Sequence, residues 1–135
     1  MVFDPSLNVS AGEQIRSRRV ELAAEMVRLQ FDRSPALRDS LDDEGVAKSI
    51  RDAEYNLQFL SEAIASGDPG SFASYLVWLD GVLAGVGLSR SVLDGHLDCL
   101  LETLAANLDT GTGALATEYV ESGRRALATR RGGTA

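Results

Sequence analysis

The sequence has little of the chemistry on which most catalytic and metal sites depend, because one cysteine, one histidine and one lysine are present among 135 residues. A single cysteine excludes an internal disulfide. Apolar runs of the roughly 18–20 residues that a membrane-spanning helix needs are also absent. The first fifteen residues lack a basic segment followed by an apolar one. We therefore expect no secretory signal, no membrane contact and a cytoplasmic location.

Basic charge is scarce as well. Thirteen arginine and lysine residues stand against twenty acids, which gives a net charge of −7. Four of the arginines follow residue 123, where the sequence has no acid, so residues 1–123 carry a net charge of −11. A surface this acidic repels a phosphate backbone, and we expect no nucleic-acid partner. The basic residues 130–135 predict a flexible, solvated tail.

Helical periodicity is what the sequence does have. Apolar residues recur at spacings of three and four, and no segment shows the alternation of a half-buried strand. After an irregular lead over residues 1–9, Ser10 and Glu13 form a capping box that predicts a helix from about Ala11 to Asp32. Ser34-Pro35 predicts the start of a second, short helix.

The third and fourth predicted helices are joined by Gly67-Asp68-Pro69. The third starts near Val46, and its apolar residues lie on one face at alternating spacings of four and three. Glycine permits the left-handed conformation that ends a helix, Asp68 supplies an N-cap, and Pro69 suits the first turn. The fourth helix is predicted to end at Gly85-Val86-Gly87. A connection this short favours antiparallel neighbours.

Two more helices complete the prediction. Ser89 or Ser91 caps a fifth, which carries a stripe of leucines up to Leu108. Residues 110–113 are predicted to form a turn before a last helix, from Ala114 to about Thr129. We therefore expect an all-α protein with a single helical domain over residues 1–135. Its predicted architecture is an antiparallel helical bundle of four long helices plus a short extra helix, with a globin-like helical fold as the alternative.

The segment Asp94-Gly-His96-Leu-Asp98-Cys99 brings the histidine and the cysteine together in the sequence. Zinc takes four ligands rich in nitrogen and sulfur, or three and a water, and the chain has no second His or Cys. A lone histidine can hold haem, but the leucines that flank His96 are typical of an ordinary helical core. Packing of a hydrogen-bonded His96 is the favoured interpretation. We expect no metal, no cofactor and no catalytic residue, and thus a protein that is not an enzyme.

Five aromatic residues cluster around the predicted connection between the third and fourth helices: Tyr55, Phe59, Phe72, Tyr75 and Trp78. Core packing, the wall of an apolar pocket and a dimer interface all fit such a cluster. Together with His96, these residues are the candidates for a ligand or interface site. Tyr55 and Phe59 lie off the seam of their helix, and a helix with more than one apolar face needs a second surface. We therefore expect a homodimer formed through the third or fourth helix, with Trp78 at an interface or pocket.

A spaced set of residues in this region carries a family resemblance: Asp52, Leu57, Phe59, Leu60, Ala63, Gly67, Asp68, Pro69, Phe72, Tyr75 and Trp78. Over about residues 51–88 the sequence resembles the helical N-terminal modules of bacterial stressosome-type (RsbR-like) regulators and of regulators with a cobalamin-binding domain. Asn56 stands where such modules carry a histidine. The resemblance implies a sensory or regulatory helical domain, often dimeric, that passes a signal to an output.

Two functional hypotheses follow from these observations. The first is a non-enzymatic sensory or regulatory module of bacterial signalling, which acts through self-association or through a protein partner in the pathway. The alternative is a helical bundle that binds a small molecule or a tetrapyrrole among its aromatic residues.

Overall fold

The computed structural model describes residues 5–132, and almost all of them are helical. This part of the chain forms seven α-helices: α1 (Pro5–Ser17), α2 (Arg19–Arg33), α3 (Pro35–Asp39), α4 (Asp43–Ser66), α5 (Pro69–Gly85), α6 (Arg90–Asn107) and α7 (Thr110–Gly132). The described residues contain no strand, so the predicted all-α helical bundle is confirmed. Apart from the short α3, six helices rather than four are thirteen residues or longer. None of the described helices is long and apolar enough to cross a bilayer.

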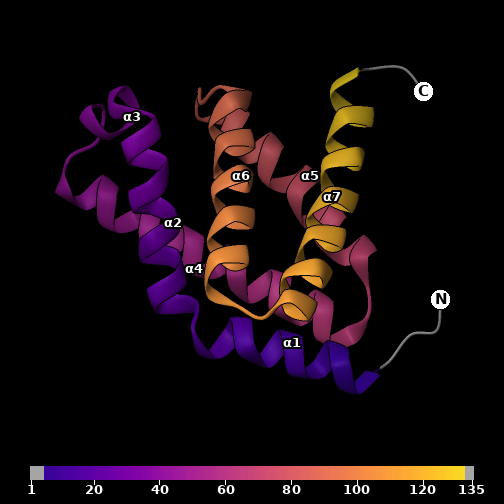
Figure 1. The fold of residues 1–135 in the computed structure, drawn as a ribbon. Helices are drawn as coiled ribbons and strands as arrows, with labels where there is room; N and C mark the ends of the chain where they lie inside the picture. The colour runs from indigo at the N-terminus through magenta and orange to yellow at the C-terminus, as the bar shows by residue number, and fades with distance from the viewer. Residues whose placement is uncertain (1–4, 133–135) are drawn as a thin grey trace.

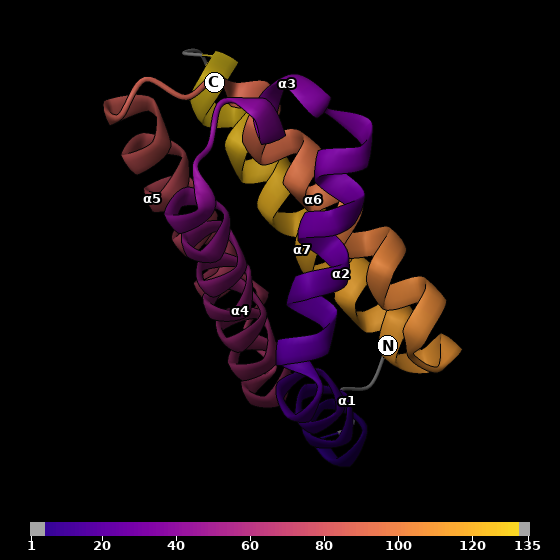
Figure 2. The same ribbon diagram turned by 90° about the vertical axis from the view of Figure 1, so that its left-hand side faces the viewer.

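Five helices form a ring, and α1 lies across one end of it (Figure 1). Around the ring, α4 packs against α2, α2 against α6, α6 against α7, α7 against α5, and α5 against α4. Figure 2 shows α4 and α5 on one side of the molecule and α2, α6 and α7 on the other. The inside of the ring is the hydrophobic core, and its largest completely buried side chains are Phe72, Ile15, Leu22, Met26, Leu57, Leu60, Ile64, Leu76, Leu93, Leu97, Leu100 and Leu104.

Two glycines set how closely the helices approach one another. A Cβ added to Gly12 of α1 would lie 2.6 Å from the carbonyl oxygen of Ser61 on α4. A Cβ added to Gly123 of α7 would lie 2.4 Å from Cδ1 of Leu76 on α5. Both distances are shorter than van der Waals contact, so a larger residue at either position would push two helices apart or displace a core leucine.

The predicted connection between α4 and α5 is confirmed. Gly67 adopts a left-handed conformation with φ of 68°, and its amide hydrogen-bonds to the last turn of α4. Pro69 is the first residue of α5, and Asp68 Oδ1 accepts a hydrogen bond from the Ser71 amide at 3.2 Å. The acidic run before α4 acts in the same way, because Asp42 Oδ1 accepts from the Gly45 amide at 2.7 Å.

The Asp68→Ala variant is expected to lose about 0.5–2 kcal/mol of unfolding free energy, because it leaves an amide in the first turn of α5 without its acceptor. Urea denaturation followed by circular dichroism measures the loss. Asp39→Ala is the matched control, since Asp39 is exposed at the end of α3 and caps no helix. Equal stability losses in the two variants would contradict the capping role.

The N-terminal prediction is wrong in two respects. The lead is helical from Pro5 onward, so Ser10 lies inside α1 and does not cap it. The predicted single helix is also broken at Arg18, whose backbone is not helical. The Arg18 guanidinium donates to the Asn107 carbonyl at 2.7 Å, so a contact with the end of α6 accompanies the change of direction. The sequence contained one signal for the earlier start of this helix, because residues 4–5 are an Asp-Pro pair like Asp68-Pro69 at the start of α5.

The C-terminal prediction is also corrected. Residues 110–113 are the first turn of α7 rather than a separate turn, because Asp109 Oδ1 accepts a hydrogen bond from the Thr112 amide at 2.8 Å. This bond lowers the pKa of the Asp109 carboxyl. The helix then continues to Gly132, so residues 130–132 are not a flexible tail. The rest of that predicted tail, residues 133–135, lies outside the described residues.

Candidate functional site

The candidate aromatic residues divide between the core and the surface. Phe72 is completely buried and Tyr75 is 9% exposed, whereas Tyr55 is 61% and Trp78 60% exposed. Phe59 is half-buried between them. The structure therefore places Phe72 in the core, and Tyr55 and Trp78 on the surface.

Four of these rings form a continuous ladder from α4 to α5. The ring centroids of Tyr55 and Phe59 are 5.4 Å apart, Phe59 and Tyr75 stack at 4.1 Å, and Tyr75 and Trp78 are 5.8 Å apart. The Phe59–Tyr75 stack joins the aromatic residues of α5 to those of α4. Aromatic pairs at these distances contribute about 0.5–1.5 kcal/mol beyond their burial. We call Tyr55, Phe59, Tyr75 and Trp78 the aromatic ladder.

A polar cluster lies on the inner side of the ladder. The Tyr75 hydroxyl donates a short hydrogen bond to Asn56 Oδ1, and Asn56 Nδ2 lies 3.1 Å from Nε2 of His96. Because Oδ1 accepts from Tyr75, the amide nitrogen must be the atom that faces His96, and an amide nitrogen can only donate. Nε2 is therefore an acceptor, and the imidazole carries its proton on Nδ1.

The environment keeps this cluster uncharged near neutral pH. Burial lowers the pKa of His96 to about 4, although the nearby Asp52 carboxylate acts in the opposite direction. Burial, with Tyr55 and Asp52 in support, raises the pKa of Tyr75 to about 12. A neutral imidazole that accepts and a protonated phenol that donates are the states that the hydrogen bonds require.

His96 and Asn56 line a cavity of about 160 Å³ between α2, α4, α5 and α6. Its apolar wall includes Val27, Phe31, Leu79, Leu83, Val92 and Leu93. Its polar lining comprises Gln30, Ser40, Ser49, Asp52, Asn56 and His96. In this cavity the polar cluster meets open space between the helices.

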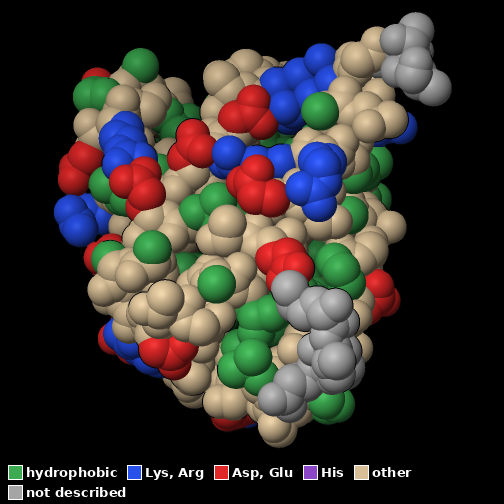
Figure 3. All heavy atoms as spheres, turned by 45° about the vertical axis from the view of Figure 1, so that its right-hand side comes forward, with side chains coloured by type: hydrophobic (Ala, Val, Ile, Leu, Met, Phe, Trp, Pro, Cys, Tyr) green, Lys and Arg blue, Asp and Glu red, His purple; other side chains and the backbone are tan. Residues whose placement is uncertain are grey.

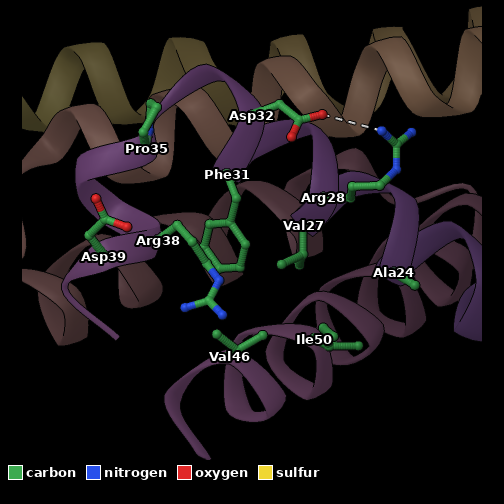
Figure 4. A pocket seen from close by; sticks show the side chains of 10 residues that line it. All are labelled: Ala24, Val27, Arg28, Phe31, Asp32, Pro35, Arg38, Asp39, Val46 and Ile50. Atoms are coloured by element: carbon green, nitrogen blue, oxygen red, sulfur yellow. Dashed lines mark hydrogen bonds and ion pairs between the residues drawn. The ribbon is translucent and has the colours of Figure 1, made fainter. Parts of the chain in front are cut away.

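A wider groove lies outside this cavity, between α2, α3 and the start of α4 (Figure 4). Its volume is about 540 Å³. Figure 4 shows the Arg38 side chain beside the Phe31 ring in this groove, and the Arg38 guanidinium lies 5.9 Å from the centre of the ring. Val27 and Phe31 line both spaces, so these two side chains form the wall between the groove and the cavity.

The segment Asp94–Cys99 does not form one site, because its side chains point to different partners. His96 bonds to Asn56, Asp94 pairs with Arg131 at 2.8 Å, and Asp98 pairs with Arg124 at 2.6 Å. Cys99 is buried, and burial raises the pKa of its thiol. Within residues 5–132 no group of three or more His, Cys, Asp or Glu side chains is arranged to hold a metal ion.

Two polar arrangements were missed by reasoning from the sequence. Asn56 was noted only as a departure from a motif, since its partner His96 lies forty residues away. Asp80 and Arg131 form a nearly buried pair at 2.7 Å that ties α5 to the end of α7. The signal for the second was a lone acid inside the apolar α5. Figure 3 shows acidic and basic side chains side by side on the face that holds the end of α7.

No protein-family model and no curated protein matches this chain.

Proposed function

We propose that this protein is a non-enzymatic regulatory module of bacterial signalling that acts by self-association, with the outer face of α5 as the contact between two copies. The observation that carries the proposal is the exposure of Trp78 and Val82 on α5 and of its C-cap residue Val86, which follow one another at four-residue spacing. Trp78 is 60%, Val82 42% and Val86 70% exposed. Adjoining exposed apolar side chains of this size are typical of interaction surfaces.

The outer face of α5 carries no charge. The one charged residue of this helix is Asp80, and it is buried against Arg131. Gly81 and Gly85 are exposed on α5, and a Cβ added to either would meet nothing within 4 Å. Glycine in a helix interior costs about 1 kcal/mol relative to alanine, and within one copy no close packing offsets this loss. Because Gly81 and Gly85 have no side chain, a helix of a second copy could approach α5 closely at these positions.

An uncharged apolar face is complementary to itself, which favours a second copy as the occupant. With a net charge of −7, two copies repel one another over most of their surface. A two-fold symmetric dimer brings the same patch of both copies together, so an uncharged patch avoids like charges at the contact. Tyr55 extends this face onto α4 through the aromatic ladder.

The resemblance of residues 51–88 to the helical modules of stressosome-type regulators supports the regulatory part of the proposal. These residues comprise most of α4 and all of α5, which are the helices that present the aromatic ladder and the exposed face. Association through this face therefore uses the same segment that carries the resemblance.

The chain is expected to be a dimer at high micromolar concentration, with about twice its monomer mass of 14.4 kDa by light scattering. Trp78→Ala should shift the mass to that of the monomer without loss of helical circular dichroism, since a side chain that is 60% exposed contributes little to the core. Gly81→Leu should also weaken the dimer while leaving the monomer folded, because the added side chain meets open space within one copy.

Val9→Ala is the matched control for Trp78→Ala, because Val9 is 55% exposed on α1, away from α5. It should leave the dimer unchanged. A wild-type protein that stays monomeric at high micromolar concentration would contradict the proposal. So would a Trp78→Ala protein that dimerises with unaltered affinity.

A further inference from the structure

The cavity beside His96 has a volume of about 160 Å³ and opens to solvent at one end. Its lining residues Ser40, Asp52 and Leu88 are exposed, whereas Val27 and Leu93 at its inner side are buried. Engineered apolar cavities of about 150 Å³ in other proteins stay dry and take up benzene. The space between α2, α4, α5 and α6 is therefore large enough for a ring of six atoms.

The lining of the cavity is chemically asymmetric, as a binding site requires. Leucine, valine and phenylalanine side chains from α2, α3, α5, α6 and the loops that follow α3 and α5 form most of the wall. Asn56 and His96 supply polar atoms from the facing helices α4 and α6. Pockets that bind small molecules have this character, with a mostly apolar lining and a few fixed polar groups that orient the ligand.

Two hydrogen-bond donors of this pair are left over after the pairing described above. Asn56 Nδ2 has two hydrogens, and one of them is given to His96 Nε2. The proton on His96 Nδ1 has no acceptor among residues 5–132. Tyr75 holds the Asn56 amide in place from the opposite side. The pair is thus pre-organised to donate to a ligand atom rather than to accept from one.

We propose that this cavity binds one small, neutral molecule, with an apolar ring-sized body against Leu83 and its neighbours and an acceptor oxygen hydrogen-bonded to the Nδ1 hydrogen of His96. Ketones, ethers and alcohols are the chemical classes that fit. An anion is disfavoured, because Asp52 lines the same cavity and the chain carries a net charge of −7. The imidazole stays neutral near pH 7, so no cation is available there to pair with a carboxylate. This site is separate from the outer face of α5 and does not depend on self-association.

A ligand can enter this cavity directly from solvent, because its lining residues Ser40, Asp52 and Leu88 are exposed. Val27 and Phe31 separate it from the outer groove shown in Figure 4.

Three probes with the same six-membered ring test the proposal: cyclohexanone, cyclohexane and cyclohexanecarboxylate. Titration of ¹⁵N-labelled protein, followed by amide and imidazole nitrogen shifts in NMR spectra, gives the dissociation constants. Cyclohexanone should bind at millimolar concentration or below and shift the His96 imidazole signals. Cyclohexane should bind about three- to tenfold more weakly, which is the worth of one hydrogen bond, and the carboxylate should not bind.

Two variants locate the site. Leu83→Trp should abolish cyclohexanone binding by filling the cavity, whereas Leu101→Trp on α6, outside the cavity lining, should leave it unchanged. His96→Phe keeps an aromatic ring and removes the donor, so it should erase the preference for cyclohexanone over cyclohexane. This variant serves as the test if Leu83→Trp does not fold.

Three results would overturn the proposal: no probe binds, Leu83→Trp binds cyclohexanone as the wild type does, or His96→Phe keeps the preference. Cyclohexanone binding that is unaltered in Trp78→Ala would show that the cavity acts independently of the dimer. The two proposals can therefore be tested separately, because a monomeric protein would not contradict the ligand site and a protein that binds no probe would not contradict the dimer.

Discussion

Phe72→Ala is expected to lose about 3–5 kcal/mol of unfolding free energy, which approaches the whole stability of many domains of this size. Phe72 is completely buried on α5, where it contacts Tyr75 with ring centroids 6.1 Å apart. Its removal leaves a cavity in the ring of helices, and the surrounding side chains fill such a cavity only partly. Urea denaturation followed by far-ultraviolet circular dichroism measures the loss, or shows an unfolded chain without denaturant.

Trp78→Ala is the variant with which the stability loss of Phe72→Ala should be compared. Both variants truncate an aromatic residue of α5, but Trp78 is 60% exposed and Phe72 is not exposed at all. The expected order is a large loss of stability for Phe72→Ala and a small one for Trp78→Ala. Equal losses would show that the outer face of α5 is part of the folded core in solution, against the exposure described above.

The fold of α4 and α5 was predictable because its determinants are local. The left-handed Gly67, the Asp68 cap and the N1 proline act within a few residues, and each was visible in the sequence. The seam of α4 was visible for the same reason, since spacing along one helix decides which face is buried. Nearly all the information for this connection lies within one turn on either side of it.

The break between α1 and α2 could not be predicted in that way. No glycine or proline stands at Arg18, and its side chain bonds to the Asn107 carbonyl at 2.7 Å. The partner is eighty-nine residues away in the sequence. Local signals predict a continuous helix there, and a contact made only in the folded protein accompanies the break.

The candidate site was predictable in its residue types but not in its pairing. His96 was singled out together with Asp94, Asp98 and Cys99, because these are neighbours along the chain. In the folded protein the imidazole faces the other way across the core, toward Asn56 on α4. The division of the aromatic residues between core and surface likewise depends on which side of α5 packs against α7. Because α5 is apolar on nearly all sides, the spacing of its apolar residues did not predict that side.

The second large effect expected is a loss of about 2–3 kcal/mol of stability between pH 7 and pH 4.5, caused by His96. The pKa of this imidazole is about 4 in the folded protein and has its ordinary value of 6.5 in the unfolded chain. Between these values the unfolded chain binds more protons, so stability is complete above pH 6.5 and falls as the pH drops toward 4. Urea denaturation at a series of pH values measures this slope.

The assignment of this slope to one residue is direct, because the chain has a single histidine. Three carboxyls also have a pKa lowered by their partners, and their contribution to stability is lost as the pH falls below the ordinary carboxyl pKa. They are Asp80 beside Arg131, Glu102 beside Arg33 and Asp109 beside the Thr112 amide. The loss of stability caused by these carboxyls therefore begins at a pH where the loss caused by His96 is nearly complete.

His96→Gln is the control, since glutamine keeps a polar side chain and does not titrate. Its stability should change by less than about 1 kcal/mol between pH 7 and pH 4.5. In the wild type, the imidazole signals should show titration near pH 4 rather than near 6.5. An imidazole that titrates near 6.5 would mean that burial does not disfavour the charged form of His96, and the predicted loss of stability would then be wrong.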